Sequence, residues 1–97
     1  MSYLVEILLP VPGDGSSTLE RIRDELTEAF GGVTMHVDAP ADGLWKDGGE
    51  VDRDRIVVVE VMADYLDRSW WAAYRHQLES SFEQEEILVR ASEIERL

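Results

Sequence analysis

The residue types that most often perform chemistry are sparse in this chain. It has no cysteine and two histidines, His36 and His76, in 97 residues. Disulfides, thiolate metal sites and cysteine nucleophiles are therefore excluded, and two distant histidines do not form a metal site. Acid–base and ionic chemistry remains, and its candidates are His36, Glu60 and Glu6. No motif names a reaction, and we predict no metal site and no cofactor.

Whether these three residues meet depends on the strands that carry them. Alternating and β-branched runs predict four strands, over residues 3–9, 33–38, 55–62 and 87–92. Apolar residues at helical spacing predict two amphipathic helices, over residues 17–30 and about 67–82. The long connection between the middle strands contains Asp47-Gly48-Gly49, where we expect a small hairpin.

The predicted order is strand, helix, strand, strand, helix, strand. Strands joined through a helix are parallel with a right-handed crossover, and two such units favour a split β-α-β arrangement. We therefore predict one domain, residues 1–97, with an α+β ferredoxin-like β-α-β-β-α-β sandwich. Its four-stranded antiparallel sheet would have the order 4-1-3-2, with both helices on one face.

Strand parity predicts which side of the sheet meets the helices. Successive side chains of a strand point to opposite faces, and one parity of every predicted strand is entirely apolar. This predicted inner set is Val5, Ile7, Leu9, Val33, Met35, Val37, Val57, Val59, Val61, Ile87, Val89 and Ala91.

The opposite parity carries one ionisable residue in the middle of each strand. In spatial order these are Arg90, Glu6, Glu60 and His36. If the register aligns them, Arg90 pairs with Glu6 and His36 pairs with Glu60. One interpretation is an ion-pair network inside an interface. The other is a pocket in which neighbouring carboxylates and a histidine act as acid and base near neutral pH. Both interpretations stay open.

The rest of this open face is too apolar to be fully exposed to solvent. We predict that Arg90 and four apolar side chains, Leu4, Leu8, Val58 and Met62, form a ligand site or interface. Since most soluble oligomers are symmetric, the predicted cover is a second copy, which makes a homodimer.

Trp45 lies in the glycine-rich connection and has two interpretations. Exposed loops often carry binding residues, so Trp45 could be an anchor or lid over a partner's open face. Alternatively, it belongs to a hairpin that is pinned to its own domain. We include it among the ligand or interface residues.

The charge balance excludes several classes of partner. The chain has 21 acidic and 9 basic residues and a formal net charge of −12. Such a surface repels phosphate, so we expect neither nucleic acid nor an anionic membrane as partner. The first residues lack the pattern of a signal peptide, and the longest apolar run in the centre is residues 56–59. We expect a soluble cytoplasmic protein.

The chain also resembles small uncharacterised bacterial proteins with a ferredoxin-like fold, from residue 3 nearly to the C-terminus. Three segments carry the resemblance: Phe30-Gly31-Gly32-Val33-Thr34, Gly43-Leu44-Trp45 and Trp70-Trp71-Ala72-Ala73-Tyr74-Arg75. Its predicted strand order is similar to that of dimeric α/β-barrel proteins, which include small monooxygenases and isomerases, and of PII-like regulators. The resemblance implies a fold and no activity.

Two classes of function follow from these observations. The first is a dimeric module that binds a small molecule or a partner, or has a regulatory role, through the open sheet face. The alternative is a small cofactor-free enzyme, like a monooxygenase or isomerase, that uses His36 with Glu60 and Glu6. An enzyme needs a cavity that reaches the carboxylates, whereas an interaction module needs a dry or fully paired face.

Overall fold

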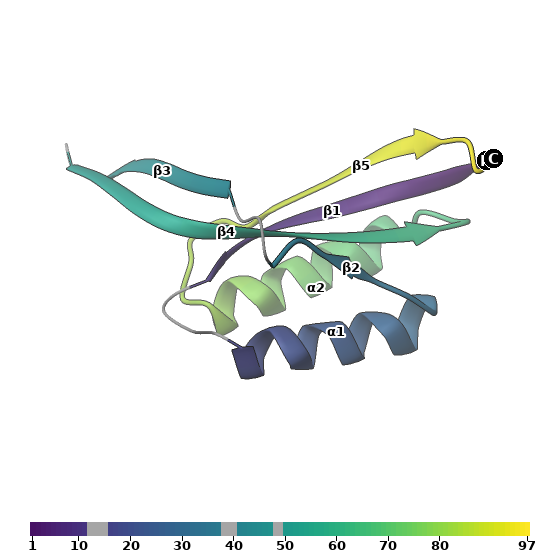
Figure 1. The fold of residues 1–97 in the computed structure, drawn as a ribbon, viewed down its shortest axis with the longest axis horizontal. Coiled ribbons are helices and arrows are strands. Elements are labelled where there is room, and N and C mark those ends of the chain that lie inside the picture. The colour runs from purple at the N-terminus through teal and green to yellow at the C-terminus, as the bar shows by residue number, and fades with distance from the viewer. Residues whose placement is uncertain (12–15, 38–40, 48–49) are drawn as a thin grey trace.

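The computed structural model of the chain describes residues 1–11, 16–37, 41–47 and 50–97. One antiparallel sheet carries two helices on a single face (Figure 1). The elements, in chain order, are β1 (Ser2–Val11), α1 (Ser16–Phe30), β2 (Thr34–Met35), β3 (Ala41–Asp47), β4 (Glu50–Ala63), α2 (Arg68–Ser81) and β5 (Leu88–Ile94).

The sheet has the predicted topology. Its order is β2-β4-β1-β5, and β3 pairs with β4 beyond β2. Counting the hairpin arm β3 with the second strand, this is the predicted order 4-1-3-2, so the ferredoxin-like sandwich is confirmed. The hairpin expected around residues 47–49 is present, because Asp47 stands opposite Glu50 where β3 and β4 meet.

The second strand, predicted over residues 33–38, is shorter than expected in the described residues, and residue 38 lies outside them. Only Thr34–Met35 form β2, and the chain pairs again with β4 at β3. Met35 stands opposite Val59, and Ala41 stands opposite Ile56. Six residue steps on the edge thus correspond to three on β4, so the edge cannot continue as one regular ladder. Its alternating pattern therefore ends early.

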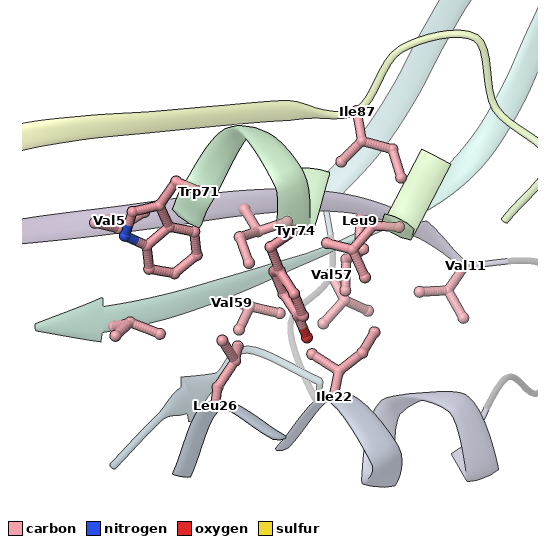
Figure 2. Packing of buried hydrophobic residues seen from close by; sticks show 13 residues of the cluster. Val5, Leu9, Val11, Ile22, Leu26, Val57, Val59, Trp71, Tyr74 and Ile87 are labelled. Carbon is pink, nitrogen blue, oxygen red and sulfur yellow. The ribbon is translucent and has the colours of Figure 1, made fainter. Parts of the chain in front are cut away.

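The hydrophobic core lies between the sheet and the helices, on the face that strand parity predicts (Figure 2). Val5, Ile7 and Leu9 of β1 are buried, as are the three predicted inner valines of β4. The helices contribute buried residues of their own, which are Ile22, Leu26, Trp71, Tyr74 and Leu78. Burial of this apolar surface is the main favourable contribution to folding.

Three positions depart from the predicted parity. Val37 is exposed because the chain has left the sheet ladder beyond His36. Ala91 is exposed on the edge strand β5, where its one methyl group is too short to reach the helices. Ile56 is buried although it belongs to the open face. It stands opposite Pro10, which is also buried.

Local residues mark the end of α1 and the start of α2. Gly31 follows α1 with φ of 84° and donates its N–H to the Thr27 carbonyl at 2.7 Å. This left-handed conformation is readily available to glycine. Asp67 is the N-cap of α2 and accepts a hydrogen bond from the Trp70 N–H at 3.1 Å. Glu79 then accepts from the N–H of Ile87 at 2.9 Å, which ties α2 to the start of β5.

Leu78→Ala tests the contribution of the core. Leu78 is almost fully buried on α2, so the substitution should lower the free energy of unfolding by about 2–5 kcal/mol. Leu97→Ala is the matched control, because Leu97 is fully exposed and its loss should change stability by less than about 0.5 kcal/mol. Urea unfolding followed by circular dichroism measures both. Equal losses would contradict this placement of the core.

Tyr74 should make stability depend on pH at the alkaline end. Burial first, and then the nearby Glu25 carboxylate, raise the pKa of its phenol above the ordinary value of 10.0. Because the folded chain holds this proton more tightly, the stabilisation is complete below about pH 10 and is lost as the pH rises further. Urea unfolding between about pH 8 and pH 11 should therefore show a smaller decline for Tyr74→Phe than for the original chain.

Tyr65→Phe is the control for this experiment, since Tyr65 is exposed. It should keep the full alkaline decline. If Tyr74→Phe declines as steeply as Tyr65→Phe, Tyr74 is not the residue responsible.

Candidate functional site

The four ionisable residues of the open face lie in a row across the sheet. Glu6 on β1 stands opposite both Glu60 on β4 and Arg90 on β5. Arg90 Nε lies 3.2 Å from Glu6 Oε1, and His36 Nε2 lies 2.6 Å from Glu60 Oε1. The row predicted from parity is therefore confirmed as geometry, together with both of its pairs. Its role is a separate question.

One detail of the row differs from the prediction. Thr34, and not His36, is the residue directly opposite Glu60. The His36 backbone N–H instead donates to the Val58 carbonyl at 3.0 Å, so its imidazole reaches Glu60 diagonally. Diagonal cross-strand neighbours are within reach of long or aromatic side chains. The pair is a hydrogen bond with neutral imidazole and becomes an ion pair when the imidazole is protonated.

The two carboxylates of the row are its less exposed groups. Arg90 and His36, at the two ends of the row, are the more exposed ones. The Glu6 and Glu60 side chains are 22% and 30% exposed, against 56% for Arg90 and 45% for His36. Two carboxylates directly opposite each other would repel. Each has a nitrogen-bearing group on its outer side, which offsets this repulsion. The row therefore presents the Arg90 guanidinium and the His36 imidazole at its more exposed ends.

Apolar pairs flank the row on both sides. Leu4 stands opposite Met62 on one side, and Leu8 stands opposite both Val58 and Leu88 on the other. Met62 and Leu88 are 49% and 47% exposed, while the other three are partly buried. Both helices lie on the opposite face of the sheet (Figure 1). The open face is thus an apolar surface with a charged band through its centre.

The remaining predicted site residue is Trp45, and the structure places only its backbone. It lies in β3 opposite Asp52 of β4. Its side chain lies outside the part of the chain that the structure describes, so neither interpretation of Trp45 is tested.

The second histidine belongs to a local contact on α2. His76 Nδ1 lies 3.3 Å from Glu79 Oε1, and its side chain is largely exposed. Among the described residues, no group of three or more His, Asp or Glu side chains is arranged to hold a metal ion. No helix of the part described is long and apolar enough to cross a membrane.

A hollow between the two helices was not predicted from the sequence. It is lined from α1 by Glu25 and Glu28, and from α2 by Trp70 and Tyr74 among others. The sequence did contain a signal for it. The lining residues of each helix recur at intervals of three or four positions, and residues at that spacing share a helix face. Which edges of the two helices face each other depends on their packing.

The comparisons with known proteins support the fold and nothing beyond it. No protein-family model matches the chain, and no curated protein is similar to it in sequence. Among solved structures, the chain is similar to the periplasmic divalent cation tolerance protein CutA from Archaeoglobus fulgidus. That likeness has a TM-score of 0.60 at 14% identity and covers 99% of this chain and 86% of the other. It supports the ferredoxin-like fold, and at this identity it carries no activity.

A double-mutant cycle measures how much the Arg90–Glu6 pair contributes in the isolated chain. Both side chains are partly exposed, so Glu6→Gln and Arg90→Gln should couple by only about 0.2–1 kcal/mol in the free energy of unfolding. The coupling should fall further in about 1 M NaCl, because salt screens exposed charges. Urea unfolding at concentrations where the chain is monomeric is the measurement. A coupling above about 2 kcal/mol would show that the pair is shielded from water.

Proposed function

We propose that this chain is a small interaction module that forms a homodimer through its open sheet face. The observation that carries the proposal is the pattern of that face. Exposed Met62 and Leu88 lie beside three partly buried apolar side chains, and no described helix covers them. Exposed apolar surface of this kind, on both sides of a charged band, is typical of interaction sites.

The charged row is compatible with burial in an interface. Each of its two carboxylates already has a hydrogen-bond partner within the chain, so covering the row does not leave either of them without a partner. Arg90 contacts Glu6 through Nε, which leaves the terminal donors of its guanidinium for carboxylates of a second copy. Directional contacts of this type give an otherwise apolar interface its register and specificity.

A second copy is the occupant we favour. An isologous interface needs a self-complementary surface, and this face supplies both apolar pairs and groups of both charge signs. Each copy would offer outward Arg90 and His36 and recessed Glu6 and Glu60. A regulatory role or a small ligand held between the copies is compatible with such a dimer.

The enzyme alternative has one observation in its favour, the contact of 2.6 Å between His36 and Glu60. A carboxylate orients an imidazole in many general bases. An enzyme also needs an enclosing cavity, and His36, Glu60 and Glu6 line neither the hollow between α1 and α2 nor the one beside Met62 and Arg96. We therefore base the proposal on interaction. A cytoplasmic location is part of the same proposal, supported by the absence of cysteine.

Charge insertion at the apolar positions tests the dimer. Met62→Lys and Leu88→Lys should each raise the dimer dissociation constant by at least about tenfold, because burying an unpaired ammonium group is costly. Sedimentation equilibrium over a range of concentrations is the measurement, with circular dichroism to show that the variants are folded.

Ala72→Lys is the matched control, since Ala72 is exposed on α2 and the substitution makes the same change in net charge. It should leave association unchanged. A chain that stays monomeric at all concentrations, or an Ala72→Lys variant that dissociates as readily as Met62→Lys, would contradict the proposed interface.

A further inference from the structure

A second surface, on the helical side of the sheet, has features of a binding site. It is a hollow of about 360 Å³ between α1 and α2. The side chains that shape it are Glu25 and Glu28 of α1, and Trp70, Ala73, Tyr74 and Gln77 of α2. The sheet lies between this groove and the open face (Figure 1), so the two surfaces can act independently.

The aromatic wall of the groove is held rigidly. The Trp70 ring is stacked on Tyr74, with centroids 5.0 Å apart and an angle of 18° between the planes. It also meets Phe30 and Trp71 edge to face, at 5.0 and 4.8 Å. Trp70 nevertheless remains 36% exposed. Ala73 beside it is small, which leaves room for a ligand against the indole.

The charged lining of the groove is entirely acidic. Arg21 lies 3.4 Å from Glu25, but this is an exposed pair within one helix and contributes little. Among the described residues, Glu28 takes part in no ion pair. The groove therefore combines an aromatic wall with two carboxylates, of which Glu25 has an ion-pair partner and Glu28 has none among the described residues.

The buried hydroxyl of Tyr74, a residue that lines the groove, lies near the Glu25 carboxylate. Tyr74 is only 6% exposed, and its hydroxyl makes no hydrogen bond of ordinary geometry with any described residue. Figure 2 shows this hydroxyl pointing from α2 toward α1, above Ile22. Buried polar groups are nearly always hydrogen-bonded, and Glu25 is the carboxylate close enough to raise the pKa of this phenol. Glu25 therefore stands between the Tyr74 hydroxyl and the groove that both residues line.

We propose that this groove binds an organic cation with an apolar body, placing the cationic head beside Glu25 and Glu28 and the body on Trp70. The two carboxylates attract the cationic head by direct charge interaction, and the exposed part of the Trp70 indole offers apolar surface to the body. An anion would be repelled by both glutamates. A neutral apolar ligand would cover the carboxylates without pairing them.

The probe is benzyltrimethylammonium, titrated into the full chain at constant ionic strength and followed by amide chemical shifts. Saturable shifts should concentrate on α1 and α2 around the groove. Benzyl alcohol, which has the apolar body without the charge, should bind at least about fivefold more weakly. Saturable binding of equal strength for the two compounds would overturn the proposal, as would shifts that scatter over the surface without saturating.

Variants on α1 separate the groove from the general acidity of the chain. Glu28→Gln should weaken binding of the probe by about three- to tenfold, because it removes the carboxylate that has no ion pair. Glu20→Gln makes the same charge change at an exposed position outside the groove lining and should leave binding unchanged. Equal losses for the two variants would show that the cation responds only to net charge. Trp70→Leu should also weaken binding, with circular dichroism confirming the fold.

Discussion

Nine consecutive residue pairs join β1 to β4, from Tyr3 opposite Ala63 to Val11 opposite Arg55. The rest of the molecule depends on this register. It turns Val5 and Val59 toward the helices, and it brings Glu6 opposite Glu60 on the other face. A slip of one residue would move each apolar set to the solvent side and bury a carboxylate. The cost of that exchange holds the two central strands in a single alignment.

The sheet thereby separates two surfaces of different chemistry. On the helical side, apolar residues of β1 and β4 pack against α1 and α2. The charged side chains of the helices lie outside this core. On the open side, apolar side chains and paired charges share one surface, as is common at protein interfaces. Most of the net charge of −12 lies outside these two surfaces. The proposed interface and the proposed cation groove therefore have separate structural origins.

Much of the fold could be predicted because its signals are periodic. Alternation in β1 and β4 and the helical stripe through Trp71, Tyr74 and Leu78 identified the core correctly. The second strand was the weak point. Its alternating pattern would fit a half-buried strand, but the registers of β2 and β3 on β4 do not continue each other, and Val37 lies outside the ladder. The number of residues between two paired positions depends on strand register in the folded chain, and the alternation of apolar and polar residues does not predict it.

The sequence by itself determined the topology, the inner face, and the identity of the four ionisable residues on the open face. These follow from local periodicity and from the few connections that a right-handed crossover allows. Only the tertiary structure decided that His36 reaches Glu60 diagonally from beside Val58, and that Glu28 and Trp70 line one groove. Such contacts join segments far apart in the chain, and their geometry depends on strand register and helix packing rather than on the spacing of residues along any one element.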